Sequence, residues 1–167
     1  MSPRRKVSSG GPFEEVVGYS RAVAAGDFIF VSGCTSVVGG EVAHEGDITR
    51  QAEQAILIAG QALAGLGASL ADVVQTRMYV TDITRWREAA QAHQLAFGDV
   101  APATTMVQVA ALIDPRLLVE VEVVAHREGG PVADDGDVDE PDPAGPRPDD
   151  FRLDDESGVD ESAGDTA

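Results

Sequence analysis

The chain has 167 residues, enough for one domain with a sizeable core, and its hydrophobic fraction of 43% is ordinary for a globular protein. Its formal net charge is −17: residues 129–167 hold 14 acidic and 2 basic side chains, whereas residues 1–128 hold 15 acidic and 10 basic ones. This balance argues against nucleic-acid binding, because affinity for phosphates comes from clustered Lys and Arg.

The single cysteine and the apolar runs indicate the compartment. Cys34 cannot form an internal disulfide, which fits a reducing environment. The N-terminus lacks an apolar run before Phe13, so we expect no signal peptide. No stretch reaches the roughly 18 apolar residues that a membrane span needs. We therefore expect a cytoplasmic protein with neither nucleic acid nor a membrane as partner.

Composition divides the chain into three parts. Residues 1–12 are rich in Ser, Gly and Arg, and we expect them to form a flexible N-terminal arm. Residues 129–167 combine Pro, Gly and Asp with few large apolar side chains, which cannot offset chain entropy, so they predict a disordered acidic tail. The folded domain is expected to span residues 13–128.

The first structured stretch predicts a β-hairpin. YSRAVAAGDFIFVSGCT contains two strand-like runs, Ser20 to Ala24 and Phe28 to Ser32, joined by Gly26, which can adopt the positive φ of a hairpin turn. A short extra pair of strands is expected near Val37 to Val42.

A helical period follows in EGDITRQAEQAILIAGQALAGLG. Asp47 is the expected N-cap, and Gly65 or Gly67 the expected C-terminal stop. The apolar positions recur at three- and four-residue steps and form one stripe: Ile48, Ala52, Ala55, Ile56, Ala59 and Leu63.

The remainder predicts three strands and a second helix. DVVQTRMYVTD alternates, with Val74, Thr76, Met78 and Val80 on one face and Val73, Gln75, Arg77 and Tyr79 on the other. TRWREAAQAHQLAFG predicts a helix that Thr84 can cap, with a shared face of Trp86, Ala89, Ala90, His93 and Phe97. PATTMVQVAAL and LLVEVEVVAHRE predict the last two strands.

The order of elements predicts an α+β architecture in which two striped helices cover one face of a sheet. The apolar residues of the last strands suggest that the other face is apolar too: Val107, Val109, Leu118, Val121 and Val123. A small domain with an uncovered apolar sheet face usually oligomerises, so we expect a multimer.

Five stretches together resemble the Rid/YjgF family, also called L-PSP endoribonuclease-like: GYSRAVAAGDFIFVSG, GASLADVV, MYVTD, FGDVAPAT and VEVEVVAHRE. The resemblance covers about residues 13–127. It implies a chorismate-mutase-like (YjgF-like) fold and a homotrimer, with the sheets forming a barrel-like core and small-molecule clefts at the subunit interfaces. In the active branch of the family, enamine and imine intermediates are hydrolysed to 2-keto acids and ammonia.

The resemblance also implies a set of cleft residues. Tyr19 falls where the family places a cleft tyrosine, and Ser32 and Gly33 fall on the family's backbone wall. Glu120 matches the glutamate that holds the attacking water, if one extra residue is allowed in the turn at residues 113–116.

At three cleft positions this chain departs from the resemblance. Thr104 stands where the active branch has an arginine that binds the substrate carboxylate, Met106 replaces a common cysteine, and Ala90 replaces a frequent asparagine. Threonine has one hydroxyl and no charge, whereas a guanidinium pairs with a carboxylate through two parallel hydrogen bonds. Loss of that anchor would weaken transition-state binding roughly tenfold or more.

Other candidates have both structural and functional interpretations. Glu120 and Glu122 point to one face of a strand and need a watery cleft or a partner such as Arg77 or Arg116. His93 is interpreted as a packed helix residue. Cys34 is interpreted as a small core residue rather than a nucleophile.

The histidines have no ligand spacing, so we expect neither a metal nor a cofactor. Arg85 or Arg87 could replace the missing anion anchor if either side chain turned into the cleft.

Three functions remain open. One is a trimeric protein that binds or senses an imine, an enamine or a related small metabolite. A second is an active 2-iminobutanoate/2-iminopropanoate deaminase, a hydrolase using water held by Glu120. The third, a ribonuclease, is opposed by the acidic charge.

Overall fold

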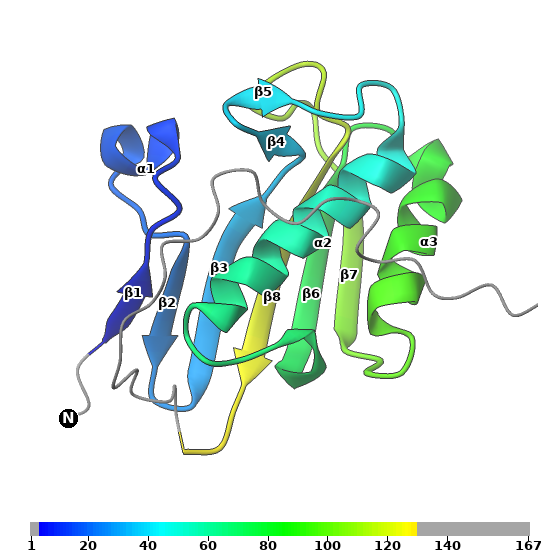
Figure 1. The fold of residues 1–167 in the computed structure, drawn as a ribbon. Helices are drawn as coiled ribbons and strands as arrows, with labels where there is room; N and C mark the ends of the chain where they lie inside the picture. Colours follow the sequence, from blue (N-terminus) through cyan, green and yellow to red (C-terminus); the bar gives the residue numbers. More distant parts are fainter. Residues whose placement is uncertain (1–3, 130–167) are drawn as a thin grey trace, which may run out of the picture. The chain divides into compact units, whose positions relative to one another are not determined.

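A six-stranded mixed sheet with two long helices on one face organises residues 4–129, the part of the chain that the computed structural model describes (Figure 1). The strand order is β1-β2-β3-β8-β6-β7. The strands are β1 (Arg5–Val7), β2 (Ala22–Ala25), β3 (Phe28–Cys34), β6 (Val73–Val80), β7 (Ala103–Gln108) and β8 (Val119–His126). β6 and β7 are parallel, and the other neighbours are antiparallel. The α+β prediction is confirmed.

The predicted hairpin is present as β2 and β3, with Gly26 at a φ of 61° in the turn. β2 begins two residues later than expected, at Ala22, and β3 continues to Cys34. The expected extra pair is also present, as β4 (Val37–Val38) and β5 (Glu41–Val42).

Helix α2 (Ile48–Ala64) begins and ends as its sequence predicts. The Asp47 side chain accepts a hydrogen bond from the Arg50 backbone N–H at 3.0 Å, and Gly65 occupies the C-cap. All six residues of the predicted stripe are buried, so this face of α2 packs on the sheet.

Helix α3 (Trp86–Phe97) is present, but Thr84 does not cap it. A 3-10 turn (Ile83–Arg85) precedes the helix, and its N-cap is Asp82, whose carboxylate accepts hydrogen bonds from Thr84. Of the predicted helix face, Ala89 and Phe97 are buried, whereas Trp86 is 44% exposed.

The strand β6 corrects one predicted alternation. Thr76, Met78 and Val80 share the buried face as expected, but Val73 is buried and Val74 is 44% exposed. The register of β6 against β8 shifts between Val73 and Gln75. The bulge changes which side chains point inward. A strict alternation predicted across it therefore assigns Val73 and Val74 to the wrong faces.

The segment predicted as a flexible arm contains regular structure. Arg5–Val7 form strand β1, which pairs with β2, and Pro12–Val17 form the short helix α1. Nearly all of the predicted acidic tail lies outside the described residues.

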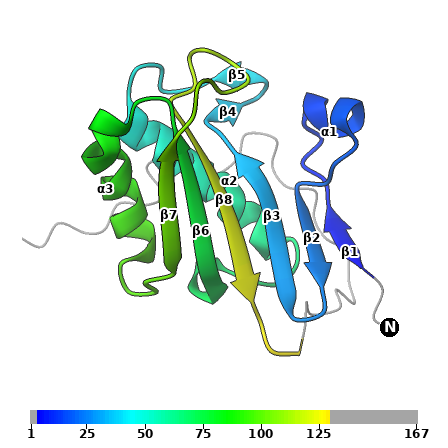
Figure 2. The ribbon, with the colours of Figure 1, turned by 180° about the vertical axis from the view of Figure 1, so that it is seen from behind.

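The two faces of the sheet differ. The helix-covered face holds the core, including Ile29, Leu63 and Met78, each fully buried. The other face is not covered by α2 or α3 (Figure 2). It carries Phe28, Phe30 and Val107, which are 44%, 48% and 42% exposed. We refer to it below as the open face.

Candidate functional site

The carboxylate of Glu120 lies on the open face directly over Gly33. Glu120 is in β8, where it alternates with the buried Val119 and Val121 and pairs in register with Tyr79 of β6. Beside it, β3 has an irregular register between Val31 and Cys34. A Cβ atom added to Gly33 would overlap Glu120 Oε1 and lie 2.7 Å from its Cδ, so only glycine leaves room for this carboxylate.

Arg21, for which the sequence predicts no role, connects two of the predicted site residues. Its Nη1 donates to the Gly33 carbonyl at 2.6 Å, and its Nη2 donates to the Tyr19 hydroxyl at 2.9 Å. The guanidinium also lies 5.4 Å from the centroid of the Tyr19 ring. The side chain of Arg21 is only 12% exposed, so it forms the back of the site.

Glu14 of α1 balances the charge of Arg21. Its Oε1 lies 3.8 Å from Arg21 Nε, and it accepts hydrogen bonds from the Ser9 backbone N–H at 3.0 Å and from the Ser8 and Ser9 hydroxyls. Burial acts to raise the pKa of Glu14, but the hydrogen bonds and the charge of Arg21 bring it below its usual value. Glu14 is therefore an ionised and fully engaged carboxylate.

Glu122 is engaged in the same way on the other side of Glu120. Its Oε1 accepts from Arg77 Nη1 at 2.6 Å, and its Oε2 accepts from the Tyr79 hydroxyl at 3.0 Å. The suggested pairing of Glu122 with Arg77 is present, whereas Arg116 pairs with Glu45 and Asp114 instead.

Glu120 differs from both of these carboxylates. It is half-buried, and within residues 4–129 its carboxylate has no hydrogen bond. Burial raises the pKa of Glu120, the nearby charge of Arg21 lowers it in part, and the charge of Glu122 raises it further. A half-buried carboxylate without hydrogen bonds is energetically costly, so this side chain is available to a ligand or water.

A second group of expected site residues lies on the helix-covered side of the protomer. Thr104 of β7 aligns with the buried Thr76 of β6, and their hydroxyls are 2.9 Å apart. Nε2 of His93 lies 2.9 Å from Thr76 Oγ1 and 3.3 Å from Thr104 Oγ1. Burial lowers the pKa of His93, which favours the neutral imidazole. Met106 packs at the edge of the core and Ala90 is half-buried on α3.

One protomer therefore does not bring all the expected site residues together. Tyr19 and Gly33 are linked through Arg21, and Glu120 lies over Gly33. Ser32 joins them because its backbone N–H donates to the Arg21 carbonyl at 3.0 Å. Thr104 aligns with Thr76, whereas Glu120 pairs with Tyr79, and these two β6 residues point to opposite faces of the sheet.

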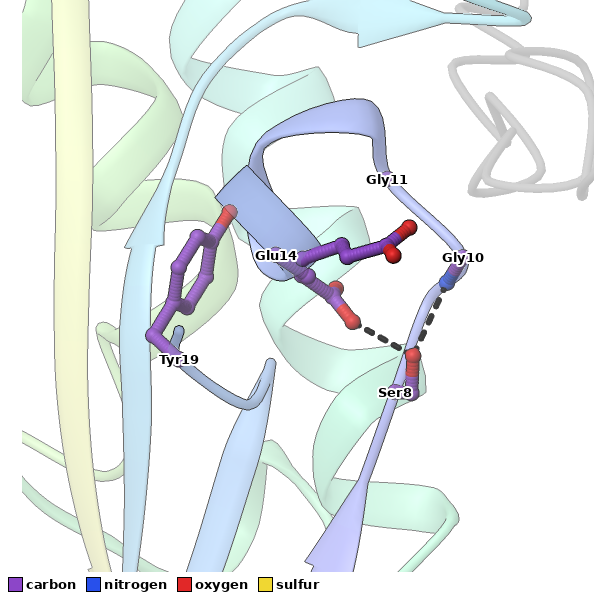
Figure 3. A pocket seen from close by; sticks show the side chains of 6 residues that line it. Ser8, Gly10, Gly11, Glu14 and Tyr19 are labelled. Carbon is purple, nitrogen blue, oxygen red and sulfur yellow. Dashed lines mark hydrogen bonds between the residues drawn. The ribbon is translucent and has the colours of Figure 1, made fainter. Parts of the chain in front are cut away.

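A pocket of about 370 Å³ lies beside Tyr19 (Figure 3). It is lined by Ser8, Gly10, Gly11, Glu14, Glu15 and Tyr19. The Ser8 hydroxyl connects two other lining residues, because it donates to Glu14 and accepts from the Gly10 backbone N–H at 3.2 Å. The charged side chains that line this pocket are both carboxylates.

Cys34 is a buried core residue, as its sequence context predicts. Burial raises the pKa of Cys34 to about 11, and its Sγ contacts the Ser32 carbonyl at 3.2 Å. The thiol is thus a protonated core group. Among residues 4–129, no three His, Cys, Asp or Glu side chains form a group that could hold a metal ion.

The family described as Endoribonuclease L-PSP matches residues 12–127. The chain belongs to the L-PSP/YjgF family. The family match runs from the start of α1 to the residue after β8, so it includes Tyr19, Gly33, Thr104 and Glu120.

The chain is also similar to individual proteins. SCO2049 of Streptomyces coelicolor is 40% identical over 123 residues, which cover 74% of this chain and 92% of that protein. A RutC family protein of Pyrococcus abyssi is 34% identical over 113 residues, covering 66% and 87%. The crystal structure of Rv2704 from Mycobacterium tuberculosis, a YjgF/YER057c/UK114 family member, has a TM-score of 0.68 at 50% identity, covering 74% of this chain and 99% of that one.

Among residues 4–129, none of the helices has the length and apolar character needed to cross a bilayer.

Proposed function

We propose that this protein binds a small imine or enamine metabolite at Glu120 and hydrolyses it with a water molecule that Glu120 holds. The observation that carries the proposal is the contrast between three carboxylates. Glu14 and Glu122 are each engaged by hydrogen bonds and an arginine, whereas the half-buried Glu120 has no hydrogen bond within residues 4–129. A group held at this cost is typical of a functional site.

The chemistry follows from the position of this carboxylate. Glu120 accepts a proton from the attacking water as the water oxygen bonds to the imine carbon. With the imine protonated on nitrogen, Glu120 then returns this proton to the nitrogen of the adduct, and the C–N bond breaks. The hydroxyl oxygen forms the carbonyl and gives its own proton to the departing ammonia. The raised pKa of Glu120 suits this exchange, because a general base is most effective when its pKa approaches the working pH.

The proposed active unit is a homotrimer. Phe28, Phe30 and Val107 are exposed on the open face, and an apolar sheet face of this kind is stabilised when other copies cover it. Membership of the L-PSP/YjgF family supports the same assembly, in which Thr104 and Met106 of one subunit would approach Glu120 of another. We further propose that the protein acts in the cytoplasm.

The alternative function is binding or sensing without turnover. Thr104, where the resemblance predicts a carboxylate-binding arginine, favours this alternative for amino-acid-derived imines. The ribonuclease named in the family description is opposed by charge, because residues 1–128 hold 15 acidic and 10 basic side chains.

The test is imine hydrolysis by the purified full-length protein. An amine oxidase generates an imine from pentylamine, and an amino-acid oxidase generates the corresponding imine from norleucine, which differs by one carboxylate. Competition with semicarbazide reports how fast each imine disappears. We expect hydrolysis of at least one imine to accelerate, to fall at least tenfold in Glu120→Gln, and to persist in Glu53→Gln, a matched change on the exposed side of α2. Acceleration that survives in Glu120→Gln, or no acceleration of either imine, would overturn the hydrolase proposal.

A further inference from the structure

The charges around Glu120 leave one carboxylate without a balancing cation. Arg77 is paired with Glu122 at 2.6 Å, and Arg21 lies 3.8 Å from Glu14. These two pairs cancel, so the ionised Glu120 gives the group of five side chains a net negative charge. In the proposed trimer, Thr104 of a neighbouring subunit would add no charge to this group.

Arg21 is not free to bind a ligand carboxylate. A carboxylate pairs best with two parallel N–H groups along one edge of a guanidinium. Nη1 of Arg21 already donates to the Gly33 carbonyl and contacts Cys34 Sγ, and Nη2 donates to the Tyr19 hydroxyl. Nε has no hydrogen-bond partner within residues 4–129, but it is buried and lies 3.8 Å from Glu14 Oε1. Moreover, the side chain of Arg21 is only 12% exposed, so little of this cation is accessible to a ligand anion.

The surroundings of Tyr19 have the same sign. The neighbouring pocket has Glu14 and Glu15 as its charged lining side chains (Figure 3). A carboxylate entering here would be repelled by like charge, whereas an ammonium or iminium group would be attracted by the same carboxylates.

From this arrangement we propose that the ligand of the Glu120 site is an imine derived from a simple amine, cationic or neutral and without a carboxylate. This inference rests on the proposed function and specifies its substrate class. In the complex the iminium carbon lies next to Glu120, and the positive charge of the ligand balances the charge of this carboxylate. No arginine–carboxylate pair is then needed to bind the ligand. The site thus selects against imines of amino acids.

The reaction of such a substrate is balanced without any further reactant. Water adds to the iminium carbon, forming a C–O bond, and one proton of the water passes to Glu120. The nitrogen of the resulting carbinolamine takes this proton back from Glu120, and its C–N bond breaks. The hydroxyl oxygen then forms the carbonyl and gives its own proton to the departing ammonia. The products are an aldehyde and ammonium, and no oxidant or reductant is consumed.

The inference is tested first by binding of three stable compounds to the full-length protein near neutral pH. Pentylamine is a cation, norleucine is the same skeleton with an added carboxylate, and hexanoate is an anion. We expect pentylamine to bind at least tenfold more tightly than hexanoate, with norleucine between them. Equal or tighter binding of hexanoate or norleucine would overturn the inference, and so would the absence of binding by all three.

A charge variant tests the cause of this order. Glu14→Gln keeps an oxygen acceptor for Ser8 and Ser9 but leaves the charge of Arg21 unbalanced, so the preference for pentylamine over hexanoate should narrow severalfold. Glu53→Gln, which removes the same charge from the exposed side of α2, should leave the preference unchanged. An unchanged preference in Glu14→Gln, or equal narrowing in both variants, would contradict the argument.

The two oxidase-generated imines separate this inference from the proposed function. Faster hydrolysis of the pentylamine-derived imine supports both. Faster hydrolysis of the norleucine-derived imine would overturn the substrate class and leave the hydrolase intact. If neither imine is hydrolysed faster, the hydrolase fails, and the binding order alone decides the inference.

Discussion

At the scale of single residues, the site depends on one carboxylate that the fold does not satisfy. Glu14 and Glu122 belong to the structure, because each accepts hydrogen bonds and has an arginine partner. Glu120 has no hydrogen bond within residues 4–129, and its pKa is raised by burial and by Glu122. An ionised group of this kind lowers stability in exchange for function, and the following predictions depend on that property.

Glu120→Gln should remove imine hydrolysis and at the same time raise thermal stability near neutral pH. Because folding raises the pKa of Glu120, its ionised form destabilises the native state at every pH above that raised pKa. The gain in melting temperature should shrink as the pH falls through the raised pKa, where the wild-type carboxyl becomes protonated. Melting curves from pH 4 to pH 8 measure this, and a variant less stable than wild type at neutral pH would contradict it.

Gly33→Ala should displace the Glu120 carboxylate. The added Cβ overlaps the end of the Glu120 side chain, which can rotate away, so the melting temperature should change little while imine hydrolysis falls at least tenfold. The control is Gly60→Ala, a change inside α2. The added Cβ would make ordinary contacts of 3.5 Å or more with the Leu70 side chain, so this variant should keep full activity. Equal activity in the two variants would show that Glu120 does not need its place over Gly33.

At the scale of secondary structure, hydrophobic periodicity and capping residues predict most of the helices and strands. The stripe and the Asp47 cap of α2 are local signals, and both are present. The bulge at Val73–Gln75 was missed because its position is set by pairing with β8, which lies about 50 residues further along the chain. Helix α1 was missed because six residues are too short for a period.

The candidate site was only partly predictable for a related reason. Tyr19, Gly33 and Glu120 came from resemblance to a family, and the fold links them. Arg21 had a visible signal, a lone charge next to an apolar strand, but its partners depend on how β2 meets β3 and α1. The contact of Glu120 with Gly33 was not predictable from local sequence, because the two residues are 87 positions apart in the chain.

Asp47→Ala should destabilise the domain by about 1 kcal/mol, because it removes the side chain that accepts from the first turn of α2. Urea unfolding measures the change. Asp99→Ala, an exposed aspartate in the loop after α3, is the matched control and should differ from wild type by less than about 0.5 kcal/mol. Equal losses in the two variants would mean that the cap contributes nothing specific.

At the scale of the whole molecule, the open face predicts assembly. Phe28 and Phe30 lie side by side on β3, with ring centroids 6.3 Å apart, and both are almost half exposed in the isolated protomer. Phe30→Glu should therefore dissociate the proposed trimer, because a charge would be buried in an apolar contact. Leu95→Glu, on α3 and 62% exposed, should leave the assembly intact. Light scattering after gel filtration measures both, and a monomeric wild-type protein would contradict the proposed assembly.

The most direct test of the account follows the ionisation of Glu120 itself. Carbon-13 NMR of the labelled side-chain carboxyls, assigned with Glu120→Gln, gives its pKa with and without pentylamine. The account predicts a pKa above the ordinary value for glutamate in the free protein and a lower pKa when pentylamine is bound, because the ligand cation stabilises the carboxylate. An ordinary pKa that pentylamine leaves unchanged would show that Glu120 neither carries the cost of burial nor contacts the ligand.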